Sequence, residues 1–335
     1  MLRADSAHVP CAGSESGRAM TAPTVTPFFT VFTPTYNRAH TLHRVFRSLS
    51  AQTFRNFEWL VVDDGSTDQT PELIKEWARA SDFPIRYLRQ PHSGRHVAHN
   101  RAIREARGEM WTSIDSDDAL VPHALQRIRD LWLEIPDSER ANFFSVSGLC
   151  QDQQGNPISQ PFPTSPFDVD VREYMFVHRR FAGEKWGASR MDAVRRFPFP
   201  EMAGTNFIPE GVHGLQMARA CRVIRFVNEV FRIYYVDDIE TGATLSSRRN
   251  IAQGAPGRLY YYLWLLNHEL DYLLRAPWPF IKAAAMLPVV TRYSGRPLRD
   301  IWRGLKNWPA KLLVIAAMPL SLLLSIFFRL IGQRK

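Results

Sequence analysis

The stretch Glu58-Trp59-Leu60-Val61-Val62, followed at once by Asp63-Asp64-Gly65-Ser66, decides the fold. Its first part is a mostly apolar, β-rich run with the length of a buried strand. Its second part consists of turn formers, because Asp, Gly and Ser suit tight turns. A buried strand that ends on carboxylates is typical of an open α/β sheet, in which ligands bind beyond the carboxyl ends of the strands.

Strands and helices alternate on both sides of this stretch. The hydrophobic pattern predicts further strands at residues 28–32, 85–88 and 110–114, and helices near residues 42–49, 70–80 and 98–106. Thr70 and Pro71 mark a helix start, with a capping hydroxyl and a proline at the first helical position. Alternation at this spacing predicts a mostly parallel sheet with helices on its faces.

The alternation loosens after about residue 123. The pattern there predicts a helix over 124–133, a strand over 142–149, a loop over 151–170 with four prolines, a hairpin over 222–236 that turns at Asn228-Glu229, and an aromatic, Leu-rich helix over 260–274. The second half of the domain is therefore expected to be less regular than the first.

Composition sets the broad class. The chain has 335 residues, 45% of them apolar, which is enough for a sizeable core and excludes global disorder. Three scattered cysteines exclude a disulfide scaffold or a zinc site and indicate a reducing compartment. Residues 1–26 have no apolar segment of signal-peptide length, so we expect a disordered leader there, with Met20 as an alternative start.

A second acidic cluster, Asp115-Ser116-Asp117-Asp118, follows the predicted strand 110–114. In an open parallel sheet this cluster and Asp63-Asp64 would line one crevice. Two carboxylates one residue apart offer oxygen ligands to a hard divalent cation, which commonly bridges to substrate phosphates. The alternative for an acidic strand end is a turn or a helix cap, and a second cluster two strands earlier makes that alternative less favoured.

Three motifs in order resemble the family 2 glycosyltransferases of the GT-A fold. They are Thr33-Pro34-Thr35-Tyr36-Asn37-Arg38, Val61-Val62-Asp63-Asp64-Gly65-Ser66-Thr67-Asp68 and Ile114-Asp115-Ser116-Asp117-Asp118. The segment Phe207-Ile208-Pro209-Glu210-Gly211 extends the resemblance into the second half. The resemblance implies a Rossmann-like GT-A domain over residues 27–245, with a nucleotide-sugar half at 27–130 and an acceptor half at 131–245.

The resemblance also implies how a nucleoside-diphosphate sugar is held, with a UDP-linked sugar as the expected donor. Five residues at the ends of the first two strands are implied to contact the donor. Thr33, Pro34 and Thr35 would form walls around the base and ribose, and Asp64, with Asp63, would accept hydrogen bonds from the base. Gly94, Arg95 and Asn100 match the segment that approaches the diphosphate and ribose, where a cation suits phosphate charge.

The metal and the proton acceptor follow from the same resemblance. Asp117 matches a ligand of Mn²⁺ or Mg²⁺, and Asp115 would bind the metal or the ribose. The family inverts the anomeric centre in a single displacement, in which a cation stabilises the leaving diphosphate and a carboxylate takes the acceptor proton. Glu210 matches that carboxylate, although Gly211 stands where the family often has Asp. There are two alternatives. Glu210 would be an ordinary glutamate at a helix N-terminus, or Glu184 would be the base.

Further sequence features bear on the acceptor. Trp186 would pack against an acceptor sugar or be an ordinary buried tryptophan, and Gln216-Met217-Ala218-Arg219-Ala220 lacks the tryptophan of processive synthases. We therefore expect non-processive transfer to a hydroxyl of a lipid-linked or envelope glycan. The alternatives are a sugar nucleotidyltransferase-like enzyme and a non-catalytic, nucleotide-sugar-binding membrane scaffold.

The formal net charge of +9 lies mostly in the last forty residues. Residues 295–335 hold eight Lys and Arg against one Asp, and they surround the uncharged 17-residue run 312–328, which Pro319 interrupts. As one helix this run would be about 25 Å long, the short limit for a span. An interfacial or re-entrant helix, a span, and a helix packed on the domain or on a partner all remain open.

Residues 246–335 are thus expected to form a helical, membrane-associating extension that binds an anionic membrane surface and not nucleic acid. Residues 276–290 are expected to add a second membrane-facing surface. Because nucleotide sugars are cytosolic, the expected location is the cytoplasmic face of the plasma (inner) membrane.

Overall fold

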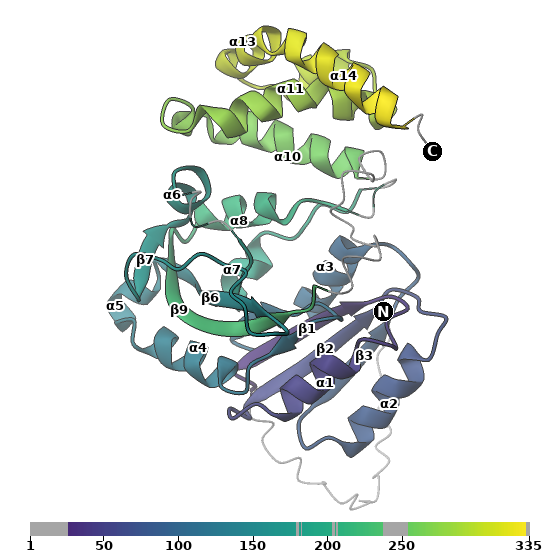
Figure 1. The fold of residues 1–335 in the computed structure, drawn as a ribbon, viewed down its shortest axis with the longest axis vertical. Helices are drawn as coiled ribbons and strands as arrows, with labels where there is room; N and C mark the ends of the chain where they lie inside the picture. Colours follow the sequence, from purple (N-terminus) through teal and green to yellow (C-terminus); the bar gives the residue numbers. More distant parts are fainter. Residues whose placement is uncertain are drawn as a thin grey trace, which may run out of the picture.

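The computed structural model describes residues 26–178, 181, 183–202, 205, 207–236 and 254–332. The expected leader, apart from residue 26, and the expected domain boundary at 245/246 lie outside the described residues. Within them, nine strands form one sheet in the order β3-β2-β1-β4-β8-β6-β9-β5, with β7 paired to β9. Helices cover both faces of this sheet, and a separate layer of helices stacks on one end of the domain (Figure 1).

The first half of the sheet is parallel, as the alternation predicts. Its strands are β1 (Phe29–Thr35), β2 (Phe57–Asp63), β3 (Ile85–Arg89) and β4 (Met110–Ser113), which pair in parallel. The crossover helices are α1 (His43–Ser50), α2 (Thr70–Ala80) and α3 (Arg95–Glu105). α1 and α2 pack into the core on one face, and α3 packs into the core on the other. The α/β class with a GT-A-like sheet is confirmed.

The start of α2 differs in one detail from the expected cap. Thr70 is the first helical residue, and its backbone N–H donates to the Asp68 carboxylate at 3.0 Å. The Thr70 hydroxyl instead accepts from the backbone N–H of Arg38 at 3.3 Å. Asp68 therefore satisfies a helix-end donor, while Thr70 ties the helix to the loop after β1.

The second half of the sheet adds antiparallel pairings. Its elements are β5 (Ala119–Leu120), α4 (Ala124–Leu133), α5 (Asp137–Arg140), β6 (Phe143–Asp152), β7 (Phe167–Asp170), α6 (Val171–Phe176), β8 (Lys185–Arg190), α7 (Met191–Arg196), α8 (Glu210–Ala218) and β9 (Val223–Tyr234). β8 runs antiparallel to both β4 and β6, so it joins the two halves of the sheet. Part of the expected 151–170 loop is the strand β7.

The hairpin predicted over 222–236 is wrong, because β9 is one continuous strand of 12 residues. The polar pair in its middle forms a bulge instead of a turn, since the register with β6 shifts between Ser147 and Leu149. The Asn228 side chain exchanges hydrogen bonds with the backbone of Phe162, and Glu229 pairs with Arg127 at 3.0 Å. Tertiary partners thus satisfy the two residues that look like a turn in sequence.

The C-terminal layer forms a core that Phe176 of α6 and Leu215 of α8 also join. It contains α10 (Ala255–His268), a short 3₁₀ turn (Leu270–Tyr272), α11 (Pro277–Tyr293), α12 (Arg299–Gly304), α13 (Trp308–Ala316) and α14 (Met318–Gly332). α10 begins and ends earlier than the predicted 260–274. Residues 283–290 of α11 are buried in this core. A second membrane-facing surface over 276–290 is therefore wrong for most of that range.

Among the described helices, no single one has both the length and the apolar composition to cross a bilayer. α13 and α14 meet the test only as a pair, and they are bent by 56° relative to each other near Pro319.

Candidate active site

Three parallel strands end beside one another and bring both acidic clusters to one edge of the sheet. Thr35 at the end of β1 is in register with Asp63 at the end of β2, and Phe32 is in register with Ser113 at the end of β4. Asp63-Asp64 and Asp115 therefore leave the sheet at the same edge, as expected for the ligand-binding edge of an open parallel sheet.

Asp64 organises the loop that leads into α3. Its carboxylate accepts from the backbone N–H groups of Ser93 at 2.9 Å and Gly94 at 2.8 Å, and from Gln90 Nε2 at 2.8 Å. His92 Nδ1 lies 2.9 Å from the same carboxylate. Asp64 thus places Gly94 and the first turn of α3. Its hydrogen bond to a base stays a prediction.

Asp63 is fully buried, and both of its carboxylate oxygens accept hydrogen bonds. One oxygen accepts from the backbone N–H of Ser66 at 2.8 Å, and the other accepts from the Tyr87 hydroxyl at 2.5 Å. Burial, together with this bond to Asp63, raises the pKa of Tyr87 above its ordinary value. Asp63 therefore shapes the turn that presents Asp64 and Ser66.

The end of β1 presents an aromatic face that the sequence reading did not assign. Thr33 is buried and its hydroxyl accepts from Trp59 Nε1 at 2.9 Å, while Thr35 is buried and Pro34 half-buried. Tyr36, the next residue, is 44% exposed and stacks on His92 with ring centroids 4.3 Å apart. The sequence signal for this aromatic face is the position of Tyr36 directly after Thr33-Pro34-Thr35.

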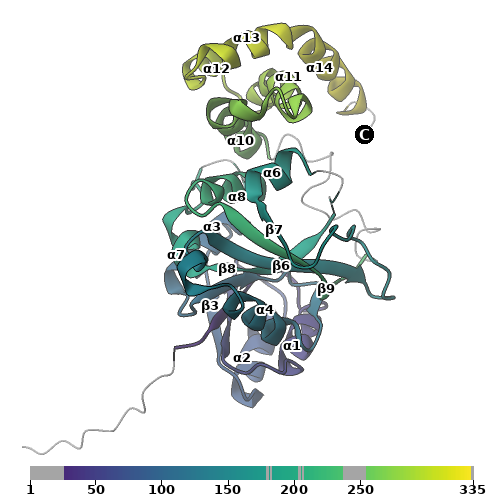
Figure 2. The same cartoon turned by 90° about the vertical axis from the view of Figure 1, so that its left-hand side faces the viewer.

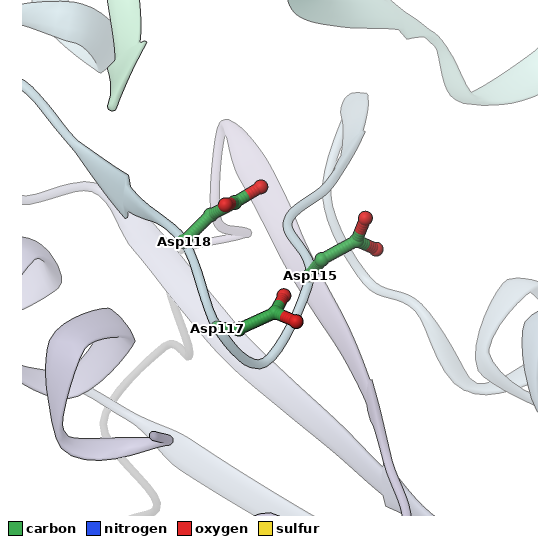
Figure 3. Close-up of side chains that lie close together, drawn as sticks. All are labelled: Asp115, Asp117 and Asp118. Atoms are coloured by element: carbon green, nitrogen blue, oxygen red, sulfur yellow. The ribbon is translucent and has the colours of Figure 1, made fainter. Parts of the chain in front are cut away.

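Three carboxylates converge where β4 leads into β5. Ligand oxygens of Asp115, Asp117 and Asp118 all lie within 4.8 Å of one another (Figure 3). A set of carboxylate oxygens in this arrangement fits a hard divalent cation such as Mg²⁺ or Mn²⁺. Asp118 was part of the quoted motif but was not named as a ligand, because sequence alone does not show which way its side chain points.

Two arginines flank this carboxylate cluster. Burial opposes ionisation of Asp115, but the Arg95 guanidinium at 2.8 Å, with Arg232 further away, lowers the pKa of Asp115 below its ordinary value. Asp118 is more deeply buried, and burial raises its pKa to about 8 although Arg232 lies 3.6 Å away. Arg232 also pairs with Glu184 at 2.9 Å. The competing base candidate Glu184 thus already has a cationic partner.

Arg95 links the carboxylate cluster to Glu210. Its Nη2 lies 2.8 Å from Asp115 and 3.1 Å from Glu210, the first residue of α8. Glu210 is also the N-terminal glutamate of a helix, as its alternative interpretation predicts, and its side chain is 67% exposed. The fold therefore brings Gly94, Arg95, Asp115 and Glu210 together from α3, the β4–β5 connection and α8.

Two other residues from the sequence reading have protein partners. The Asn100 side chain donates to the backbone oxygen of Phe199 at 2.7 Å and accepts from the N–H of Phe199 at 2.9 Å. Trp186 is buried, and its Nε1 donates to the backbone oxygen of Ser113 at 2.8 Å. Trp186 therefore supports the end of β4 from within the core, and packing against an acceptor sugar is wrong for it.

The mixed sheet with carboxylates beyond its parallel strands defines a GT-A-like protein. The crystal structure of S. aureus TarS 1-349 in complex with UDP-GlcNAc has the same fold, with a TM-score of 0.55 at 18% identity over 87% of this chain and 79% of that chain. Another crystal structure of S. aureus TarS 1-349 superposes with a TM-score of 0.52 at 19% identity.

Sequence comparison shows similarity to glycosyltransferases over the first half of the domain. Residues 30–148 match the model of glycosyl transferase family 2. A GalNAc(5)-diNAcBac-PP-undecaprenol beta-1,3-glucosyltransferase of Campylobacter jejuni is 24% identical over 67% of this chain and 70% of that protein. The putative glycosyltransferase EpsH of Bacillus subtilis is 34% identical over about half of each chain. Over residues 30–148 the chain is therefore similar to the family 2 glycosyltransferases.

Proposed function

We propose that this enzyme transfers a sugar from a nucleoside-diphosphate sugar, with UDP as the carrier, to a hydroxyl of a lipid-linked or envelope glycan. The observation that carries the proposal is the contact of Arg95 with both Asp115 and Glu210 beside the three-carboxylate cluster. This contact supports the proposal that the carboxylate cluster binds a metal, Arg95 binds phosphate and Glu210 accepts a proton around one reacting centre.

The donor is held by the edge of the sheet. Tyr36 and His92 offer a flat aromatic surface for the base next to Asp64. Gly94 and Arg95 begin α3, whose N-terminus and guanidinium favour the diphosphate. Asp115, Asp117 and Asp118 would hold Mn²⁺ or Mg²⁺, which as a Lewis acid neutralises the charge that develops on the leaving diphosphate.

Glu210 accepts the proton of the acceptor hydroxyl. Its side chain is exposed to solvent and contacts Arg95 Nη2, the same atom that contacts Asp115 in the carboxylate cluster. A hydroxyl activated there attacks the anomeric carbon from the face opposite the diphosphate, so the configuration inverts in one displacement. The lipid-linked acceptor named for the Campylobacter relative supports an acceptor of that class.

We further propose that the enzyme adds one or a few sugars at the cytoplasmic face of the plasma (inner) membrane. We divide the chain into a catalytic domain at 27–245 and a helical extension at 246–335. The packed C-terminal core supports this division, because most of its buried residues come from α10 to α14, with Phe176 of α6 and Leu215 of α8 joining them at the boundary.

The test uses the full chain, a panel of UDP-sugars and Mn²⁺ or Mg²⁺. We expect metal-dependent release of UDP, reduced at least 100-fold in Asp117→Ala and unchanged in Asp137→Ala, whose side chain is exposed on α5. Release of pyrophosphate from a nucleoside triphosphate and a sugar phosphate would instead indicate a nucleotidyltransferase. Nucleotide binding without turnover would indicate a scaffold.

A further inference from the structure

The outer face of α13 and α14 is apolar and open to solvent. Its exposed large side chains are Trp308, Leu312, Ile315, Met318, Leu320, Leu322, Leu323, Ile326 and Phe327. Trp308 is 73% exposed and Leu323 is 65% exposed. A soluble surface rarely carries a contiguous apolar patch of this kind, so the face indicates an interaction site.

The opposite side of the same helices packs inward. Val314 and Ala317 are buried, and the Ser321 hydroxyl donates to the backbone oxygen of Ala285 in α11 at 2.7 Å. α13 and α14 are thus apolar all round, with one side covered by α11 and the other side uncovered. They form the outermost layer of the molecule, on the far side of α10 and α11 from the catalytic domain (Figures 1 and 2).

The geometry of the pair favours lying in a membrane surface over crossing it. With 9 and 15 residues, the helices are about 14 Å and 22 Å long, and each is shorter than the roughly 30 Å hydrocarbon core. The 56° bend between them presents the exposed residues along a curved outer edge instead of along one straight axis.

Charge identifies the occupant. Within the described stretch 294–328, the cations Arg296, Arg299, Arg303, Lys306 and Lys311 stand against the single acid Asp300. Of these five cations, Lys311 is half-buried and the other four are exposed. Trp302 and Trp308 are exposed among them, and tryptophan favours the interface between water and lipid. A second copy of the chain would bring like charges together, whereas anionic headgroups would complement them.

We propose that α12 to α14 form a monotopic docking surface for an anionic lipid bilayer, with the apolar face of α13 and α14 in the headgroup–acyl boundary and the cations on the headgroups. The helices lie in the membrane plane and do not cross it.

The helix α10, beneath the docking surface, is fixed to the catalytic domain on the side of Glu210. Glu269, fully buried after α10, pairs with Arg172 at 2.6 Å and with Arg219 at 3.1 Å. Gln216 in α8 donates to the Tyr260 hydroxyl in α10 at 3.0 Å. α8, which begins at Glu210, therefore packs on α10, which lies between the catalytic domain and the docking surface (Figure 1). Resting on the proposed function, an acceptor anchored in the lipid would approach from the side on which the proton acceptor lies.

Vesicle flotation of the full chain tests the docking surface. We expect binding to vesicles of phosphatidylcholine with 30% phosphatidylglycerol and weak binding to phosphatidylcholine alone. The double variant L322E/L323E and the triple variant R299Q/R303Q/K306Q should each lose at least tenfold in binding to the anionic vesicles. Leu133→Glu, an exposed leucine on α4 in the catalytic domain, should bind like the parent. Circular dichroism and the melting temperature confirm that each variant folds.

Several results would overturn the proposal. They are parent protein that stays off anionic vesicles, unchanged binding in L322E/L323E, or a dimer that L322E/L323E converts to monomer without any vesicle binding. Access of a reagent to residues on both sides of the bilayer would show a span. Binding without sugar transfer would reject the proposed function and leave the docking surface standing.

Discussion

Arg95 Nη2 lies 3.1 Å from the Glu210 carboxylate and so joins the first turns of α3 and α8 across the ligand-binding edge of the sheet. The same guanidinium holds Asp115 at 2.8 Å. One cation therefore balances the metal-binding cluster and the proposed base at once. A diphosphate that binds here would compete with both carboxylates for Arg95, which releases Glu210 for proton transfer.

Replacing Arg95 should weaken use of the donor. We expect kcat/KM for the nucleotide sugar to fall about 100-fold in Arg95→Ala, because the proposed charge contact to phosphate is lost and Asp115 loses its nearest counter-charge. Arg95→Lys should have a kcat/KM between those of the parent enzyme and Arg95→Ala, because lysine keeps the charge but not the planar fork of the guanidinium. Arg104→Ala, exposed on the same helix, is the control. Equal rates for Arg95→Ala and Arg104→Ala would contradict the assignment.

Glu210→Gln should lose turnover and keep donor binding. Removal of a general base typically costs about 10²–10⁴-fold in kcat, while UDP affinity should change little because Arg95 keeps its contact with Asp115. Initial-rate kinetics and isothermal titration measure the two quantities. Glu184→Gln is the comparison, because Glu184 pairs with Arg232 instead. A larger loss of kcat in Glu184→Gln would transfer the base role to that residue.

Gly257 allows α10 to pack closely against the segment that precedes Glu210. A Cβ at Gly257 would lie 2.1 Å from the backbone oxygen of Phe207, whereas a Cβ at Gly214 in α8 would meet nothing within 4 Å. We expect Gly257→Ala to lower the free energy of unfolding by about 1–3 kcal/mol. Gly214→Ala should raise it by up to about 1 kcal/mol, because alanine favours the helix. Urea unfolding measures both, and stabilisation by both variants would argue against the close packing.

Stability should fall on acidification through the buried pair His99 and His213. Burial lowers the pKa of His213 to about 4 and, with His213 and Arg95 nearby, lowers the pKa of His99 well below its ordinary value. Between the unfolded value of about 6.5 and the folded value, the unfolded chain binds more protons, so stability is lost as the pH falls. For His213 the loss approaches about 3 kcal/mol near pH 4.

Urea unfolding at pH 7.5, 6 and 5 checks this dependence. His213→Gln should show a shallower loss between pH 7.5 and 5, and His123→Gln, an exposed histidine, should keep the parent slope. A parent slope retained in His213→Gln would place the acid sensitivity elsewhere in the chain.

Local patterns were sufficient for the first half of the fold. Helix α2 spans Thr70–Ala80 as its start signals and apolar spacing predict, and the acidic clusters lie at strand ends because a buried strand must stop where polar residues begin. Asn228 shows the limit of such patterns. It looks like a turn, but Phe162, more than sixty residues away, satisfies its side chain within a continuous strand.

Residue type and short-range spacing were enough to predict the α/β class, the order of the motifs and the candidates Asp115, Asp117 and Glu210. The folded chain was needed to show that Arg95 joins Asp115 to Glu210, that Asp118 and Arg232 complete the cluster, and that α11 is a core helix while α13 and α14 face outward. Each of these depends on which distant surfaces the chain buries together, and burial across long separations leaves no periodic signal in the sequence.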